Sequence, residues 1–488
     1  MSRRRVDIWL ASYLAGTLAR RRAARARRDG LTHVVFLVCD HFEPRHAARE
    51  PGQAERRIAA WQREFPRLQR RCRDAFGSEP LHSFFYPPHH GHEHLPALAR
   101  MVHDGLGEVE LHYHHDGDTA QTLTRDLQAA LRAYHRHGLL LQSGAPPRTA
   151  FGFIHGDWAL DNSLHGRYCG VNGELSVLAA LGCWGDFTMP SDNEAQSRKI
   201  NSIYYAVDDP ARSKSYDAGR DARAGAPRPP GFFLMQGPLA LNWRAPGHPR
   251  IENASLTSEN WGRPDRIRKW LDCAIHVQGR PDVLFVKLHT HGAIERDFDA
   301  LFGERAFAMH RVLNEQYNDG RRHRLHYVTA RQAYNIVRAL EDGAAGGPQD
   351  WKDYCIAAPP QRHCHVDVPH TLRRCQAEGV QVEDIDAAQP ATALLREGPA
   401  ASLQGSFAGF ETDRSAGRLS VESAPGALLR VALRGAVAPA RLEGGTAEAG
   451  PDSELRVRVG AGGRLALCWP QAAPGAAVPA ECAGAPLR

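Results

Sequence analysis

Short apolar runs that alternate with longer amphipathic stretches recur between Leu31 and about Leu340. The first run, HVVFLV (His33–Val38), is apolar at almost every position, which is typical of a strand covered on both faces. A helical stretch follows it, from about Ala54 to Phe76. This alternation predicts βα units, a mostly parallel sheet and an α/β fold. Further strand-like runs lie at His82–Tyr86, Val109–Tyr113, Phe151–Ile154, Trp184–Thr188, Ile203–Ala206, Phe232–Met235, Val283–Leu288 and Leu325–Val328.

Two helices carry start signals in the sequence. We expect one to begin at Asp118, with Gln121 as its capping-box partner, and to stop near Gly138. Its apolar face is expected to comprise Leu123, Leu127, Leu131 and Tyr134. A second capping pair, Thr329 with Gln332, predicts the helix that closes the main domain.

The chain of 488 residues is long enough for more than one domain, because single cores usually stop growing near about 250 to 300 residues. We expect a basic amphipathic segment over residues 1–30, the α/β domain over 31–345, a connector over 346–396 and a β-rich module over 397–488. Apolar and polar letters alternate in the last segment, as in ALLRVAL and ELRVRV, which predicts a small antiparallel β module. It holds no convergent set of titratable residues, so we expect it to serve packing, oligomerisation or carbohydrate contact.

The net charge of +6 comes from the first thirty residues, which hold nine arginines against Asp7 and Asp29, so that the remainder carries about −1. This distribution excludes a broad basic surface, and we expect no nucleic-acid partner. Ten cysteines without a CxxC pair argue against a disulfide scaffold and favour a reducing compartment. We expect a bacterial protein of the cytoplasm, either free or at the inner face of the membrane.

An apolar run from Ile8 to Ala19 lies between two groups of arginines. It is shorter than the roughly twenty residues that span a bilayer. Two interpretations stay open: the run forms a helix on an anionic membrane surface, or the helix packs on the main domain. On a membrane, the contacting side chains would be Trp9, Leu10, Tyr13, Leu14 and Leu18.

Histidines and aspartates follow five of the predicted strands at the point where each strand ends. Because the carboxyl ends of strands meet at one edge in β/α proteins, we expect these side chains to converge. The densest group, ELHYHHDGDT (Glu110–Thr119), contains His112, His114, His115 and Asp116. The other strand ends supply Asp40, His41 and Glu43 in CDHFEP, His155, Asp157 and Trp158 in IHGDW, Trp184 and Asp186 in CWGD, and His289 and His291 in LHTHG.

Three histidines and an aspartate within five residues predict a metal site, since neutral imidazole is a strong ligand for zinc. If the strand persists, His112 and His114 share a face and His115 points away. If helical turns begin at once, His112 and His115 come together instead. Asp116 is a further candidate partner of His112, and the sequence leaves this choice open.

Asp40 or His41, after the first strand, can supply a third ligand. Three protein ligands leave one position for water, as catalytic zinc sites require. We expect a divalent metal, with Zn²⁺ as the ion, that activates this water and polarises an amide carbonyl. A carboxylate can then take the proton of the water, and an imidazole can protonate the departing amine. Asp40 and His289 fit these two roles.

The order of these motifs resembles that of the polysaccharide deacetylase superfamily, carbohydrate esterase family four and its relatives, over about residues 31 to 340. The shared order is an aspartate after the first strand, a histidine cluster after a middle strand, a Trp/Asp segment and a late Leu-His pair. Members adopt a distorted (β/α) barrel and use a divalent metal, commonly zinc, to remove acetyl groups from N-acetylated sugars. The resemblance implies the same fold and activity for this chain.

Position by position, the resemblance implies Asp40 as general base, His41 in the place of a metal-binding aspartate and His112 as the first ligand. It also implies His289 as general acid and Asp186 as the aspartate that orients a catalytic histidine.

The chain departs from the superfamily at three places. His41 replaces a carboxylate, Asp116 replaces the second histidine of a His-x-x-x-His motif, and His155 with Trp158 stands where an arginine-proline motif is usual.

We expect the substrate to be an N-acetylated sugar in a cell-surface polysaccharide or its precursor, as in exopolysaccharide biosynthesis. His291 joins His289 in the expected catalytic set. Two other hypotheses stay open: a catalytically silent barrel that binds carbohydrate or assembles a complex, and a metal-dependent glycoside hydrolase. The expected sugar contacts, which include aromatic rings able to stack on sugars, are His155, Asp157, Trp158 and Trp184.

Overall fold

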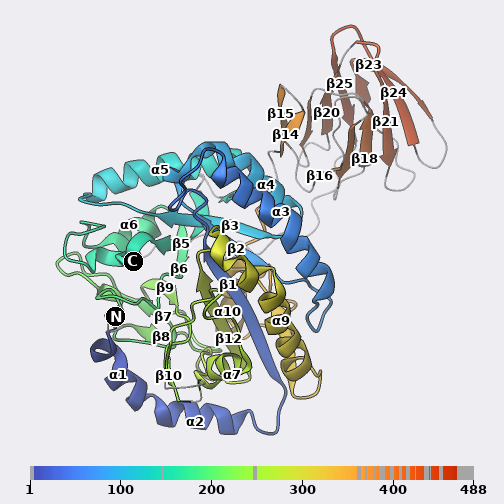
Figure 1. Cartoon of the computed structure of the whole chain (residues 1–488). Helices are drawn as coiled ribbons and strands as arrows, with labels where there is room; N and C mark the ends of the chain where they lie inside the picture. The colour runs from blue at the N-terminus through green and yellow to red at the C-terminus, as the bar shows by residue number, and fades with distance from the viewer. Residues whose placement is uncertain are drawn as a thin grey trace.

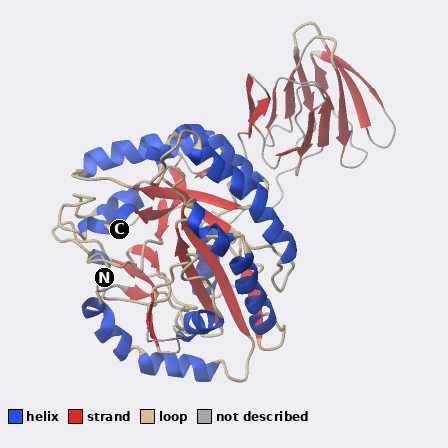
Figure 2. Ribbon diagram, viewed as in Figure 1, coloured by secondary structure: helices blue, strands red, loops and turns tan. Residues whose placement is uncertain are grey.

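The computed structural model shows a mixed α/β domain whose mostly parallel, eleven-stranded sheet is surrounded by helices (Figure 1, Figure 2). The α/β prediction is therefore confirmed. The structure describes residues 5–143, 148–243, 245, 250–359, 364–368, 371–376, 380–383, 391–395, 400–405, 409–413, 418–423, 425–433, 439, 441–449 and 454–469.

The central sheet has the strand order β12-β1-β2-β3-β5-β6-β9-β7-β8, with β13 also paired to β1 and β4 to β5. Pairs from β12 to β9 are parallel, whereas β7 is antiparallel to β9 and to β8. In the described part of the chain the end strands β12 and β8 are not paired with each other, so a closed barrel is not confirmed. The bounds are β1 Thr32–His41, β2 His82–Tyr86, β3 Gly107–Tyr113, β4 Leu141–Ser143, β5 Arg148–His155, β6 Cys183–Asp186, β7 Ile203–Ala206, β8 Arg220–Asp221, β9 Phe232–Met235, β12 Val283–Thr290 and β13 His323–Tyr327, and each predicted strand overlaps one of these. A separate hairpin consists of β10 (Ala240–Asn242) and β11 (Arg250–Glu252).

The helices of this domain are α3 (Gln53–Arg71), α4 (Leu95–His103), α5 (Ala120–Arg136), α6 (Glu174–Ala180), α7 (Pro264–Asp272), α8 (Phe298–Leu301), α9 (Glu304–Tyr317) and α10 (Ala330–Glu341). Short 3₁₀ turns lie at Pro88–His90, His92–His94, Gly156–Trp158, Leu160–Asn162, Ser215–Asp217 and Glu295–Asp297. The predicted capping box of Thr329 and Gln332 is present at α10.

Two predicted helix limits are wrong. Helix α3 ends at Arg71 instead of Phe76, because the Asp74 carboxylate accepts the amides of Phe76 and Ser78 in a turn. Helix α5 is capped by Thr119, which forms a capping box with Thr122.

Asp118 does not cap α5 because its carboxylate is engaged elsewhere. One oxygen lies 3.0 Å from His115 Nδ1, and the other accepts the hydroxyl of Thr122 at 2.7 Å.

Side chains of β1 alternate between two buried layers. On the face that we call outer, Val34, Phe36 and Val38 of the strand, and Phe42 just beyond it, belong to a layer that contains Trp61 and Phe65 of α3. On the inner face, Val35, Leu37 and Cys39 belong to a second layer that contains Phe85, Ile154, Phe187 and much of α10. Apolar residues on both faces explain the almost continuous apolar run of this strand.

The C-terminal part forms two six-stranded sheets, with strand orders β14-β15-β19-β20-β25-β22 and β16-β17-β18-β21-β24-β23. Pairing is antiparallel except between β15 and β19. The strands begin inside the segment predicted as a connector, where apolar and polar letters alternate too briefly to show a period. Their bounds are β14 Cys364–Val368, β15 Thr371–Gln376, β16 Val380–Glu383, β17 Ala391–Leu395, β18 Ala400–Gly405, β19 Gly409–Asp413, β20 Arg418–Glu422, β21 Leu428–Leu433, β22 Arg441–Glu443, β23 Gly445–Ala449, β24 Glu454–Val459 and β25 Arg464–Cys468.

Two helices at the N-terminus, α1 (Val6–Ala15) and α2 (Thr17–Ala26), lie against the α/β domain. Trp9 is fully buried and Tyr13 packs on the inner layer, while Leu14 and Leu18 are 59% and 64% exposed. Packing on the main domain, one of the two interpretations, is thus what the structure shows. Among the described helices, none combines the length and the apolar character that a bilayer crossing requires.

Candidate metal centres

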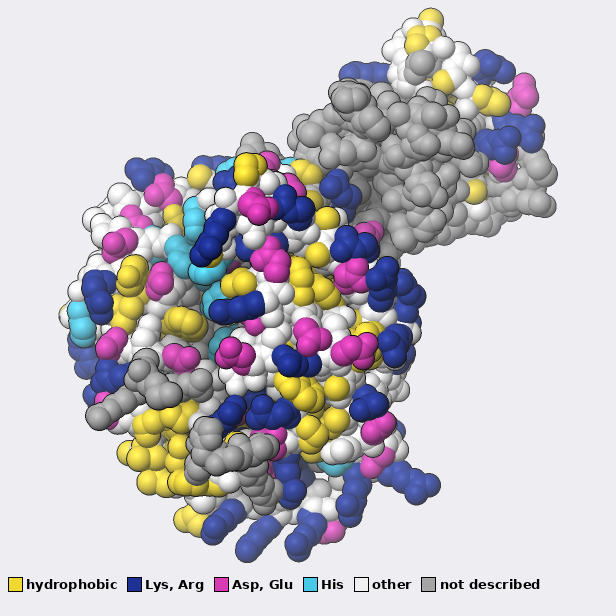
Figure 3. Space-filling model, in the orientation of Figure 1, with side chains coloured by type: hydrophobic (Ala, Val, Ile, Leu, Met, Phe, Trp, Pro, Cys, Tyr) yellow, Lys and Arg dark blue, Asp and Glu magenta, His cyan; other side chains and the backbone are white. Residues whose placement is uncertain are grey.

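Histidine and carboxylate side chains meet where β1, β3 and β5 end, and histidines gather in one region of the surface drawn in Figure 3. They form two groups that can each hold a metal ion. Cluster A is Glu43, His112 and His114, and cluster B is His115, His155, Cys169 and Glu174. In each cluster the ligand atoms all lie within 4.8 Å of one another.

The chain beyond β3 keeps the alternation of a strand. His112 and His114 both point into cluster A, whereas His115 points into cluster B. This is the arrangement expected if the strand persists, so His114 is the partner of His112.

The separations within cluster A are close to those of ligand atoms around one ion. His114 Nε2 lies 3.0 Å from both His112 Nε2 and Glu43 Oε1, and His112 Nε2 lies 3.7 Å from Glu43 Oε1. Ligand atoms bonded to tetrahedral zinc at about 2.0 to 2.2 Å are roughly 3.3 to 3.6 Å apart. The three atoms therefore need only small shifts to bind one ion.

The outer nitrogens of both cluster A histidines are occupied. His112 Nδ1 lies 2.9 Å from the carbonyl oxygen of Ile154 and can only donate to it, and His114 Nδ1 lies 3.1 Å from a carboxylate oxygen of Asp157. In neutral rings with these protons, both Nε2 atoms carry lone pairs that face each other. Metal-binding histidines are usually oriented in this way, by a carbonyl or carboxylate on the far nitrogen.

Charge in cluster A favours a cation. Burial opposes ionisation of Glu43, but hydrogen bonds and charges of the neighbouring histidines hold the pKa of Glu43 well below its usual value. Burial favours the neutral form of His114, yet Asp157 and Glu43 raise the pKa of this ring to about 9. The position between the three residues is thus suited to a proton or a metal ion.

Further rings surround cluster A. The His41 ring, at the end of β1, lies 4.8 Å from that of His112 and 4.9 Å from that of His291. Burial lowers the pKa of both His41 and His291, so their rings are neutral near pH 7. His41 Nε2 and the indole nitrogen of Trp158 are buried without a hydrogen-bond partner among the described residues. Because such atoms are costly to leave alone, they indicate room for a further ligand, water or substrate beside cluster A.

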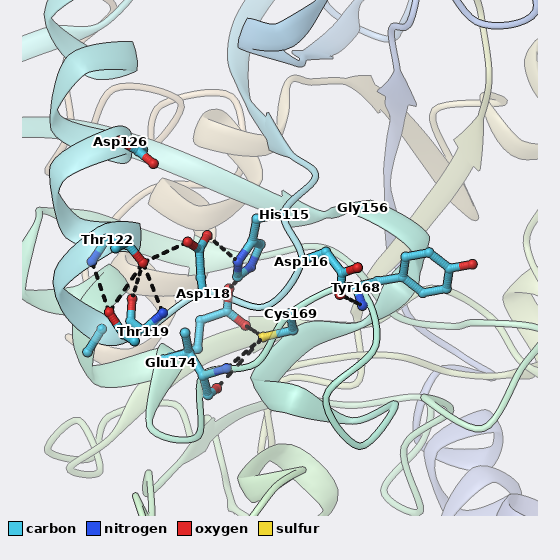
Figure 4. Close-up of polar contacts among 12 residues, drawn as sticks. His115, Asp116, Asp118, Thr119, Thr122, Asp126, Gly156, Tyr168, Cys169 and Glu174 are labelled. Carbon is cyan, nitrogen blue, oxygen red and sulfur yellow. Dashed lines mark hydrogen bonds and ion pairs between the residues drawn. The ribbon is translucent and has the colours of Figure 1, made fainter.

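Cluster B takes up two residues that were expected in other places. His115 lies here and not beside His112, with its ring next to Asp118 (Figure 4). Its Nε2 lies 2.9 Å from His155 Nε2. His155 is fully buried, so its expected contact with a sugar is wrong.

Asp40 lies on the outer face of β1, opposite to its neighbour His41. Its carboxylate accepts the amide of Gly292 at 2.6 Å and lies 3.4 Å from His82 Nδ1, with no exposed surface. Burial raises the pKa of Asp40. This placement does not support the expected role as general base; Asp40 instead holds the loop that carries His291.

Three other expected roles are corrected by the contacts of the side chains. Asp186 binds the amide and hydroxyl of Thr188 instead of a histidine side chain, and Thr188 in turn accepts the backbone amide of His155. Asp116 accepts the amide of Tyr168 at 2.7 Å and is not in either cluster. Trp184 packs on Phe187 and Tyr334 in the inner layer, away from solvent.

Glu43 was expected at a strand end without a role, and Glu174 and Cys169 were not expected in the site. Glu43 stands three residues after Asp40, where the chain has left the strand, so strand alternation did not indicate its direction. Glu174 starts α6 and Cys169 lies in the preceding loop. Only the order Cys-Gly-Val-Asn-Gly-Glu, with two turn-forming glycines between potential ligands, could have drawn attention to them.

Comparison with protein families, with curated proteins and with solved structures finds no match to this chain. The resemblance to the deacetylase superfamily thus stays a prediction from motif order. Independent support for a function comes from the geometry of the clusters.

Proposed function

We propose that the chain is a metal-dependent hydrolase that removes N-acetyl groups from a sugar, on a distorted barrel of the polysaccharide deacetylase type. The observation that carries this proposal is cluster A, in which Glu43, His112 and His114 present three ligand atoms with their outer partners in place. His114 is 29% exposed, so the cluster is open to solvent on one side. An open position beside three ligands distinguishes catalytic zinc sites from structural ones.

Zinc is the ion that fits these ligands best, since two histidines and one glutamate form a common catalytic zinc set. His41 Nε2, buried without a partner among the described residues, is available to a further ligand or to the carbonyl oxygen of the substrate. When bound, the ion would lower the pKa of a water molecule and polarise the amide carbonyl.

His291 is best placed to move the proton. Its Nε2 lies 3.7 Å from Glu43 Oε2, and its ring is 29% exposed, so it reaches both the cluster and the solvent. Because burial lowers its pKa, the ring is neutral near pH 7 and can accept a proton from water and pass it to the departing amine. Asp40 positions the loop that carries His291 by accepting the amide of Gly292, and the His289 ring lies 6.2 Å from that of His41.

Trp158 supports a carbohydrate substrate, because its ring lies 6.3 Å from that of His291 and can cover one face of a sugar. Asp157, 45% exposed, can accept sugar hydroxyls as well as His114. We further propose a bacterial cytoplasmic location, in which Leu14 and Leu18, left exposed on helices that pack on the α/β domain, make peripheral membrane contact.

Metal analysis of the full chain and of two variants tests the proposal. His112→Ala should remove one bound zinc ion, whereas His92→Ala, at an exposed histidine of the same region, should keep it. Wild type should release acetate from N-acetylated oligosaccharides without shortening them, and His291→Gln should lose this activity while it retains its metal.

Two results would overturn the proposal. One is a wild-type protein whose zinc content is unchanged by His112→Ala. The other is shortening of the oligosaccharides without acetate release, which would identify a glycoside hydrolase.

A further inference from the structure

We propose that cluster B is a second metal site, structural in character, that binds Zn²⁺ through His115, His155, Cys169 and Glu174. It is separate from cluster A and does not depend on the proposed hydrolase function. Four side chains from four different segments converge on it: the chain after β3, the end of β5, the loop before α6 and the first turn of α6.

The distances in cluster B are equal to, or a few tenths of an ångström shorter than, those between the ligand atoms of a tetrahedral site. His115 Nε2 and His155 Nε2 are 2.9 Å apart, and Glu174 Oε1 lies 3.1 Å from the first and 3.4 Å from the second. Tetrahedral nitrogen and oxygen ligands of zinc are roughly 3.3 to 3.6 Å apart. Cys169 Sγ lies within 4.8 Å of all three atoms, which leaves a small movement toward the longer zinc–sulfur bond of about 2.3 Å.

The far side of each ligand is already paired. His115 Nδ1 lies 3.0 Å from Asp118 Oδ2, and His155 Nδ1 lies 2.6 Å from the carbonyl oxygen of Gly156. Both rings can therefore carry a proton on Nδ1 and, when neutral, turn an Nε2 lone pair toward the other ring. A proton shared with Glu174 Oε1, 3.1 Å from His115 Nε2, or a bound cation removes the repulsion between two lone pairs at 2.9 Å.

The acidic ligands are prepared in the same way. Glu174 Oε2 accepts the amide of Asp161 at 2.6 Å, which leaves Oε1 for the ion. The amide of Val171 points at Cys169 Sγ from 3.4 Å, and the same sulfur lies 3.7 Å from Glu174 Oε2. Sulfur among the ligands favours zinc over magnesium or calcium, which prefer oxygen.

Burial separates the two clusters in character. In cluster B the side chains of His155 and Glu174 have no exposed surface and that of His115 has 3%. A site closed on all sides with four protein ligands is typical of structural zinc, which contributes to folding.

Cluster B lies at both ends of the loop from β5 to α6, where a bound ion would fix the path of this loop. The loop from β5 to α6 contains six non-glycine residues with positive φ, a conformation that costs energy at each: Asp157, Trp158, Asp161, Asn162, His165 and Tyr168. An ion held by His155, Cys169 and Glu174 would fix both ends of this loop, which supplies Asp157 to cluster A. Cluster B would thereby position the neighbouring site.

Metal analysis of the full chain distinguishes the two sites. Wild type should hold two zinc ions per chain and His112→Ala one. Cys169→Ser should lose the second ion or bind it at least tenfold more weakly, while Cys183→Ser, at a buried cysteine outside both clusters, should keep two. Cobalt-loaded wild type should show a thiolate-to-metal charge-transfer band, which also serves if Cys169→Ser fails to fold.

The outcomes separate the two proposals. One ion per chain that His112→Ala removes, or a cobalt spectrum without a thiolate band, would overturn the structural site. One ion that His112→Ala leaves in place and Cys169→Ser weakens would support it and overturn the proposed catalytic metal.

Discussion

Asp157→Asn is the sharpest test of how cluster A is tuned, because it changes one charge and almost no volume. The Asp157 carboxylate accepts from His114 Nδ1 at 3.1 Å and thereby directs the Nε2 lone pair toward Glu43 and His112. Residue 157 has a φ of 53°, a conformation that asparagine adopts as readily as aspartate. The backbone should therefore keep its path, and only the hydrogen bond to His114 should weaken.

The size of the effect follows from the exposure of this pair. Loss of a partner behind a metal-binding histidine costs about 10- to 100-fold in metal affinity. The Asp157 side chain is 45% exposed, so solvent screens part of its charge and we expect about tenfold, or about 1.4 kcal/mol.

Competition titration with a chromophoric chelator measures this effect on the binding step that His112→Ala removes. Asp116→Asn is the matched control, since this exposed carboxylate is close in sequence but binds the amide of Tyr168 (Figure 4). Wild-type affinity in Asp157→Asn, or an equal loss in both variants, would refute the reasoning.

Three predictions concern stability, all measured by chemical denaturation. Gly292→Ala should cost about 1 to 3 kcal/mol of stability, because a Cβ there would lie 1.8 Å from Asp40 Oδ2. Gly30→Ala is the control and should leave the stability unchanged, because the space around Gly30 is open. Equal effects of the two substitutions would contradict the predicted clash. Arg331→Met should cost about 3 to 5 kcal/mol of stability, because it leaves the Glu108 carboxylate, 2.6 Å away, without its buried partner. As a control, Arg305→Met, which removes the exposed pair with Asp299, should cost at most about 1 kcal/mol. A small loss of stability in Arg331→Met would show that Glu108 finds other partners. Burial lowers the pKa of His310 to about 3, below the value of about 6.5 in the unfolded chain. Acid therefore protonates the unfolded state first, and the stability falls by about 1.4 kcal/mol per pH unit from about pH 6.5 downward. His310→Gln should remove this part of the pH dependence, and an unchanged slope in the variant would refute the prediction.

Much of the fold was predictable because hydrophobic burial has a period. The strands from His33 to Leu325 are apolar on one or both faces, and each prediction overlaps an observed strand. Whether the sheet closes into a barrel was not predictable in the same way, since closure depends on pairing between distant strands that no local pattern encodes.

The candidate site was predicted in part for the same reason. His112 and His114 share a face because side chains alternate along a strand, and this was foreseen as one of two arrangements. The same alternation places Asp40 and His41 on opposite faces of β1, so the two side chains cannot both line cluster A.

Glu43, Cys169 and Glu174 lie beyond strand ends or at a helix start, where direction is set by the loop path. Asp118 likewise binds His115 instead of capping its helix. Tertiary contacts determine the direction of all four side chains, and no periodic pattern in the sequence predicts these contacts.

The two clusters share the segment from His112 to His115, and this limits how the sequence of this protein can change in evolution. Only one peptide bond separates His114 from His115, so an insertion or deletion there would turn the following side chains to the opposite face and dismantle both sets of ligands. Substitutions of the ligand residues in this segment are restricted, and changes in the length of the segment are restricted more. We expect homologous chains that keep this chemistry to keep the spacing from His112 to His115 unchanged.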